Sequence, residues 1–183
     1  VYAIVADVVE AGGHNGREET TTLVLIPQIC KAVKIPVIAA GGIGTGKTML
    51  AAVALGAEGV QIGSRFVTSE ESSAHINFKK AVLKAKDGDT QLSIKKLTPA
   101  RLLKNKFWEQ INRAEMSGAS EEELKIILGR ARAKKGMFEG DLDDGELEIG
   151  QISGYINEIK PAADIIVEII AEYSSALKNL NPI

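Results

Sequence analysis

Three glycine-rich segments combine small residues with groups that could bind an anion or move a proton. They are EAGGHNG at 10–16, AAGGIGTGKT at 39–48 and GSRF at 63–66. Glycine turns let a backbone approach a phosphate closely, because they carry no side chain. His14, flanked by glycines, is accessible, and an imidazole can exchange a proton near neutral pH. The segments therefore predict an anion site with a proton-handling group nearby.

The second segment also matches the phosphate-binding loop of nucleoside triphosphatases. Residues 41–48 satisfy G-x-x-x-x-G-K-[ST] between a strand-like and a helix-like run. Such a site also needs a neighbouring strand that ends in Asp to hold Mg²⁺. The next strand-like run, 59–63, ends without a carboxylate, and Asp7 precedes the loop. We favour the interpretation that Lys47 and Thr48 merely begin a helix, and a P-loop nucleotide-binding protein stays open as an alternative.

The elements that must position these segments are strand-helix units. Continuous apolar runs predict strands over 1–8, 35–40 and 59–63, and helices are predicted over 21–33 and 47–55. Such strands with helical crossovers form parallel sheets covered on both faces. In a (β/α)8 barrel, the loops after the last two strands commonly bind a phosphate. Gly41, Gly42, Gly63 and Ser64 supply that pair of loops, which makes the fold class α/β.

The remainder of the chain reads as mainly helical. Helices are predicted over 72–85, 97–118, 120–136, 151–159 and 161–180, with a capping box between Ser120 and Glu123. His75 falls in the first of these and is assigned a structural role. The stretch 137–150 is rich in Gly and acidic residues, which favours a solvated loop over a calcium loop, so no metal is expected. We expect βα units over 1–75 and a helical extension over 76–183.

Composition limits the partners and the compartment. With 22 basic and 24 acidic residues the net charge is −2, so no global charge excess favours nucleic acid or an anionic membrane. No apolar run reaches the length of a membrane span, and Cys30 is the single cysteine. These features predict a cytoplasmic protein. The chain opens on Val1 inside a strand pattern, as a cut through a larger protein would.

Together, EAGGHNG, IPVIAAGGI and GAEGVQIGSRF resemble the FMN-dependent nitronate monooxygenase (2-nitropropane dioxygenase) family and its relative, the FMN-dependent enoyl-acyl-carrier-protein reductase. The resemblance is strong over the first 70 or so residues and looser through LLKNKF and EIGQISG. It implies that the three predicted strands are the sixth to eighth of a TIM barrel, so that the chain is its C-terminal portion. It also implies FMN in the barrel mouth, with its phosphate between AGGI and GSRF.

The same resemblance assigns roles to residues. It implies that His14 is catalytic and that the cofactor-binding positions are Gly13, Ala40, Gly41, Gly42, Gln61, Gly63, Ser64 and Gln151. Val8 stands where family members often have Gly, and Asp7 replaces a commoner Glu or Gln, so neither is assigned a flavin contact.

The implied activity is oxidation of alkyl nitronates by O2 on FMN. The alternative within the family is reduction of an enoyl chain on acyl carrier protein, with NAD(P)H as a further cofactor. The expected partners are thus a small-molecule nitronate or a carrier-bound enoyl chain, without nucleic acid or membrane, and a homodimer stays open. Because five strand-helix units of a barrel are absent, a non-catalytic barrel fragment is a further alternative.

Overall fold

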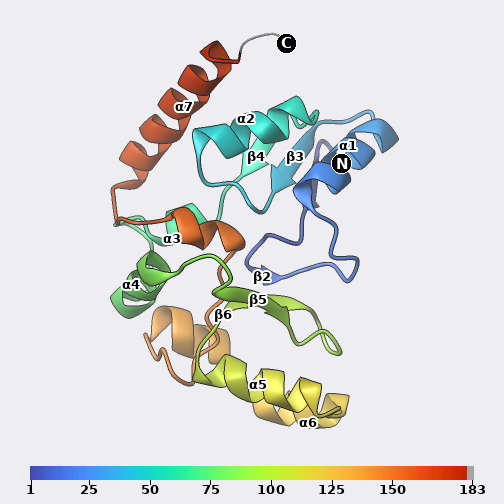
Figure 1. Ribbon diagram of the computed structural model, residues 1–183, viewed down its shortest axis with the longest axis vertical. Coiled ribbons are helices and arrows are strands. Elements are labelled where there is room, and N and C mark those ends of the chain that lie inside the picture. The colour runs from blue at the N-terminus through green and yellow to red at the C-terminus, as the bar shows by residue number, and fades with distance from the viewer. Residues whose placement is uncertain (181–183) are drawn as a thin grey trace.

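The computed structural model describes residues 1–180 and contains two small sheets with helices around them (Figure 1). The strands are β1 (Ile4–Asp7), β2 (Gly13–His14), β3 (Val37–Ala40), β4 (Gly59–Gln61), β5 (Thr90–Ser93) and β6 (Ala100–Leu103). The α-helices are α1 (Thr22–Ala32), α2 (Gly46–Ala54), α3 (Ser64–Val67), α4 (Ile76–Lys84), α5 (Lys106–Met116), α6 (Glu121–Leu128) and α7 (Ala162–Lys178). A π-helical turn η1 (Lys134–Phe138) and a 3-10 helix η2 (Gln151–Tyr155) complete the elements.

The first sheet is parallel, as its apolar strands predict. Its order is β1-β3-β4, with Ile4 opposite Val37 and Ala40 opposite Gln61. Its core consists of Ala6, Val8, Ile26, Val37, Ala39, Ile43, Ala52 and Ala57. The predicted α/β class is confirmed, but within residues 1–180 the sheet is open and forms no closed barrel.

The second sheet is antiparallel and was not predicted. Its order is β2-β6-β5, and all four residues of β6 are buried. The helix predicted over 97–118 is wrong in its first half, because this apolar run pairs with strands on both sides. The helix α5 begins only after Asn105, whose side chain accepts a hydrogen bond from the Trp108 N–H at 2.8 Å. The segment 76–183 therefore contributes strands as well as helices.

Helix ends explain the other differences from the predicted elements. The capping box between Ser120 and Glu123 is present, but α6 stops before Gly129, whose φ is +63°. The observed helix is thus about two turns shorter than the helix predicted over 120–136. α4 begins after His75, whose Nδ1 accepts from the Asn77 N–H at 3.1 Å. His75 therefore caps α4. The helix predicted over 161–180 forms as α7 over most of that range.

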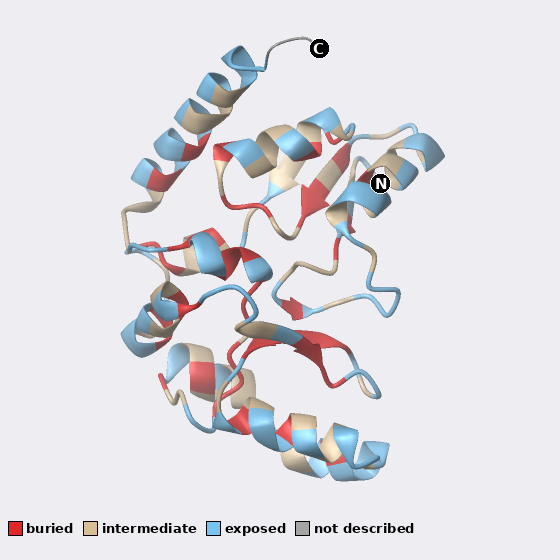
Figure 2. Cartoon of the chain, viewed as in Figure 1, coloured by how far each residue is buried: buried red, intermediate tan, exposed pale blue. Residues whose placement is uncertain are grey.

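Residues 146–151 connect the two sheets. The Leu103 N–H donates to the Leu147 carbonyl at 2.8 Å, and Glu148 lies opposite Leu102. The Gly150 N–H then donates to Ser64 Oγ at 2.9 Å. Buried residues are found in both sheets (Figure 2). In the described part of the chain, none of the helices combines the length and the apolarity that crossing a membrane requires.

Candidate functional site

A cleft of about 490 Å³ lies at the carboxyl ends of the parallel strands. Its lining residues are Val5, Asp7, Ala11, Gly12, Ala40, Gly41, Gly42, Ile43, Gln61, Gly63, Ser64, Val67, Met137, Glu148, Ile149 and Ile152. Six of the eight cofactor-binding positions expected from the sequence are among them. The volume falls within the roughly 300–1,000 Å³ of ordinary small-molecule sites. The cleft is therefore large enough for a cofactor.

Two glycine turns form one wall of this cleft. Gly41 and Gly42 have φ values of +100° and +67°, a conformation that favours glycine. A Cβ on Gly41 would lie 2.8 Å from Val8 Cγ2, so any side chain there would collide with the end of β1. A Cβ on Gly63 would meet no atom within 4 Å. Gly63 thus faces open space in the cleft.

The two turns also leave backbone donors free. Within residues 1–180, the N–H groups of Gly41, Gly42, Gly63 and Ser64 donate no hydrogen bond. Ser64 is the first residue of α3, where an N–H has no acceptor within its own helix. Free N–H groups on neighbouring glycine turns suit a phosphate, which accepts several hydrogen bonds at once. The residues present therefore fit the phosphate of a flavin mononucleotide.

The nucleotide-type loop, by contrast, already uses most of the backbone donors at the start of α2 within the chain. Thr48 Oγ1 accepts from the N–H groups of Gly44 and Thr45 at 3.1 and 3.0 Å. The Gly46 N–H donates to Glu172 Oε2 on α7 at 2.6 Å. Lys47 is exposed, and its Nζ lies 3.9 Å from the same carboxylate. The contacts favour a helix start at Lys47 and Thr48 over a triphosphate site.

His14 lines a second hollow of about 260 Å³. The hollow is lined by His14, Ile94, Leu97, Thr98, Ala100, Leu128, Gly129, Ala131, Arg132, Ala133, Glu146 and Glu148. Among residues 1–180, Glu148 alone lines both cavities. His14 is separated from the cleft because the chain leaves the parallel sheet after β1, and β2 pairs with β6, where His14 lies opposite Ala100.

The two remaining expected positions lie outside the cleft lining. Gly13 is buried against the carboxylate of Glu148. Gln151 is exposed at the start of η2, and its N–H donates to the Glu10 carbonyl at 3.0 Å. The structure thus brings six expected positions together and sets Gly13, His14 and Gln151 apart from them.

Glu146 is the residue that the sequence analysis missed. It was assigned to a solvated loop, yet only 8% of it is exposed. Burial raises its pKa to about 7, and the nearby charge of Glu148 adds to this effect, whereas His14 and Arg132 oppose it. The alternation in ELEI was the available signal, because buried Leu147 and Ile149 alternate with the two glutamates as in a strand.

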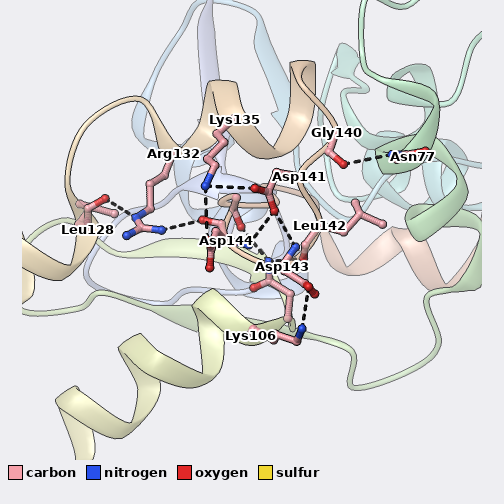
Figure 3. A network of polar contacts seen from close by, with 12 residues as sticks. Asn77, Lys106, Leu128, Arg132, Lys135, Gly140, Asp141, Leu142, Asp143 and Asp144 are labelled. Carbon is pink, nitrogen blue, oxygen red and sulfur yellow. Dashed lines mark hydrogen bonds and ion pairs between the residues drawn. The ribbon is translucent and has the colours of Figure 1, made fainter.

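The first half of the acidic stretch does form a self-contained turn (Figure 3). Asp141 Oδ1 accepts from the N–H groups of Asp143 and Asp144 at 3.0 and 2.9 Å. Lys135 lies 3.1 Å from Asp141, and Lys106 lies 2.6 Å from Asp143. The hydrogen bond from the Asp144 backbone is the main cause that keeps the pKa of Asp141 below its usual value. These carboxylates are therefore engaged by lysines and backbone.

Comparison with known proteins decides the family. The family model described as nitronate monooxygenase matches residues 2–172. The chain belongs to the nitronate monooxygenase family. Its members are flavin-dependent oxidoreductases, which agrees with the resemblance seen in the three glycine-rich segments.

Individual family members show how far the likeness extends. A Staphylococcus aureus protein named "Probable nitronate monooxygenase" is 43% identical over 124 residues, covering 62% of this chain and 34% of its own length. FabK from Thermotoga maritima is 41% identical with a TM-score of 0.92, over 98% of this chain and 57% of FabK. Nitroalkane oxidase from Streptomyces ansochromogenes is 31% identical with a TM-score of 0.78, over 99% and 54%. The matched part covers about a third of the Staphylococcus aureus protein and little more than half of each of the two solved structures.

Proposed function

We propose that this chain holds FMN in the cleft at the carboxyl ends of β1, β3 and β4, and that it takes part in the oxidation of alkyl nitronates by O2. The observation that carries the proposal is the pair of glycine turns with four free N–H groups on one cleft. The donor set suits a phosphate dianion, since the donors belong to the backbone and need no side-chain ordering. The family model and the Staphylococcus aureus relative support nitronate as substrate.

The chain's own residues have separate tasks in this proposal. Gly41, Gly42, Gly63 and Ser64 bind the phosphate, and Ala40 and Gln61 line the rest of the cleft beside them. Bound FMN supplies the electron-transfer chemistry of the reaction. His14, in the adjoining hollow, binds the substrate and holds or moves a proton at its imidazole nitrogens. Glu148 lies between the two cavities.

The extent of the fold belongs to the proposal as well. We place β1, β3 and β4 as the last three strands of a TIM barrel, with 1–75 as barrel units and 76–183 as the extension. The open sheet, the coverage of little more than half of FabK and of the nitroalkane oxidase, and the TM-score of 0.92 to FabK support this placement. The antiparallel pairing of β2 with β6 then attaches the extension to the barrel rim. A cytoplasmic location and a homodimer remain proposals of the same kind.

Enoyl reduction is the second candidate. It is favoured by the likeness to FabK, which has a higher identity and TM-score than the nitroalkane oxidase. This reaction would add NAD(P)H as electron donor and an acyl-carrier-protein-bound enoyl chain as partner. Anaerobic mixing separates the two, because NAD(P)H would bleach the flavin quickly in the reductase, whereas propyl nitronate would do so in the monooxygenase.

Two substitutions at Gly63 test the cofactor site. A side chain at Gly63 enters open space, so neither Ala nor Asp disturbs the packing of the chain. Gly63→Asp places a negative charge beside the phosphate and should weaken FMN binding about 100-fold, since like charges in contact cost several kcal/mol. Gly63→Ala adds a methyl group without a charge and is the matched control, which should weaken FMN binding less than Gly63→Asp does. Flavin fluorescence titration measures both, and equal affinity of the parent and Gly63→Asp would exclude this phosphate site.

A further inference from the structure

The hollow beside His14 contains a buried carboxyl group that the proposed function leaves unused. Glu146 is 8% exposed and lines the hollow, and within the described residues its carboxylate has no hydrogen-bond partner. Its backbone is fixed, because the Glu146 N–H donates to the Arg132 carbonyl at 3.0 Å. A Cβ on Gly136 would lie 2.6 Å from the Glu146 carbonyl oxygen, so η1 packs closely on this segment. Glu146 is thus held in place without being neutralised by a partner.

The sheet register brings His14 close to this segment. His14 lies opposite Ala100 and Glu148 lies opposite Leu102 on the same strand, β6. Residues two apart on a strand point to the same face, as do residues directly opposite each other. Glu146 precedes Glu148 by two residues, and all three side chains line the same hollow.

The cationic neighbour of the hollow is already engaged elsewhere. Arg132 Nε donates to the Leu128 carbonyl at 2.8 Å, and Nη1 donates to the Asp144 carbonyl at 2.7 Å. The guanidinium also lies 4.6 Å from the ring centroid of Phe107. Arg132 therefore offers Glu146 its charge but no hydrogen bond. The titratable and charged groups that face Glu146 are Glu148 on its own segment, His14 on β2 and Arg132 before η1.

We propose that Glu146 is a positioning residue that acts as the protonation partner of His14: when the Glu146 carboxyl loses its proton, the negative charge it acquires stabilises the proton on the imidazole. This inference rests on the proposed function, in which His14 contacts the substrate. Burial is the largest cause of the raised pKa of Glu146, about 7, and Glu148 contributes next. Two carboxylates in one site cannot both ionise at low cost, and an anion beside an imidazolium favours the charged ring.

The consequence concerns the pH range over which His14 can give a proton. A glutamate of ordinary pKa would already be charged well below neutrality and would change nothing there. Burial raises the pKa of Glu146 to about 7, so its carboxyl group becomes negatively charged close to neutral pH. That charge then favours a protonated imidazole in the same hollow.

Nuclear magnetic resonance on this chain without flavin tests the coupling directly. The chain has only two histidines, so His75, which caps α4, is an internal reference. In Glu146→Gln, the midpoint of the pH-dependent change in the His14 ring signals should move to lower pH by roughly half a unit or more, as expected for loss of an opposite charge. The His75 signals should not change. A His14 curve that superimposes on that of the parent would overturn the proposal.

The carboxyl signal of Glu146 gives a second readout. In the parent it should change around pH 7, and in Glu148→Gln the midpoint should fall, because a neighbouring negative charge is removed. Glu58→Gln, at an exposed position far along the sequence, is the control and should leave it unchanged. A Glu146 midpoint near 4.5 in the parent would also overturn the proposal.

A kinetic arm separates this proposal from the proposed function. With FMN and substrate, Glu146→Gln should shift the alkaline limb of kcat to lower pH while leaving the affinity for FMN unchanged. If FMN does not bind but the magnetic resonance coupling is present, the proposed function fails and the His14–Glu146 pair stands. If FMN binds and turnover occurs but neither His14 signals nor the pH limb respond to Glu146→Gln, the pair fails and the function stands.

Discussion

The region around the parallel sheet and the region around the antiparallel sheet build their sites from different material. The cleft beside β3 and β4 offers backbone N–H groups held by glycine turns, and the side chains that line it are mostly apolar. The lining of the hollow beside His14 includes an imidazole, two carboxyl groups and a guanidinium, from His14, Glu146, Glu148 and Arg132. In the proposed function, binding of an anion and handling of a proton are thus divided between two sheets. Glu148, which lines both cavities, marks their boundary.

Substitution of His14 should have the largest effect and bears on the antiparallel region alone. His14→Ala should lower the rate of reduction of bound flavin by about 10²–10⁴-fold, the usual loss for a general acid–base group. The affinity for FMN should not change, because His14 does not line the cleft. Stopped-flow absorbance with propyl nitronate measures the rate. Loss of FMN together with loss of rate would show that the two regions are not separate in function.

The pH dependence of stability distinguishes the hollow from the cleft. Among the described residues, Glu146 in the hollow is the carboxyl group whose pKa is raised to about 7. The pKa of Glu146 is about 7 in the folded protein and 4.5 ordinarily. Between these values the folded state binds more protons than the unfolded state, so the free energy of unfolding falls as pH rises from about 4.5 to about 7. At about 1.4 kcal/mol per pKa unit, the loss amounts to at most roughly 3.5 kcal/mol.

Glu146→Gln removes this titration. Its free energy of unfolding should exceed that of the parent above pH 7 and approach it below pH 4.5, as urea unfolding at a series of pH values would show. Glu58→Gln, exposed and free of ion pairs within the described residues, is the matched control. A parent protein whose stability is flat from pH 4.5 to 7 would contradict the assignment of a buried, protonated Glu146.

The contrast between the regions also explains what the sequence could predict. The turns at Gly41, Gly42 and Gly63 were predicted, because a backbone site depends on glycines that directly follow apolar strands. β6 was not predicted, because Ala100–Leu103 is buried by pairing with β2 and β5, and β2 lies more than 80 residues earlier. The role of Glu146 depends on that same pairing. Long-range pairing leaves only a weak local signal, such as the alternation in ELEI.

Glu172 on α7 contacts the start of α2 beside the parallel sheet, and its substitution tests what this contact contributes to stability. Glu172→Ala removes the carboxylate that accepts from the Gly46 N–H and should lower the free energy of unfolding by about 1–2 kcal/mol, as for the loss of a helix cap. Glu172→Gln keeps an acceptor without the charge and should lose less. Thermal unfolding measures both. FMN affinity should be the same in both variants, since Glu172 does not line the cleft.

Lys47→Ala should have the smallest effect and separates the flavin site from a nucleotide site. Lys47 is 76% exposed, and its ion pair with Glu172 spans 3.9 Å, so its removal should change the free energy of unfolding by less than about 1 kcal/mol. FMN titration should give the parent affinity, because the free donors belong to Gly41, Gly42, Gly63 and Ser64. A triphosphate loop would depend on this lysine. Calorimetric titration with Mg-ATP therefore distinguishes a flavin site from a nucleotide site. Binding of Mg-ATP by the parent that disappears in Lys47→Ala would assign the 41–48 motif to a nucleotide, and the contacts of Glu172 with the start of α2 would then have to give way to the phosphates.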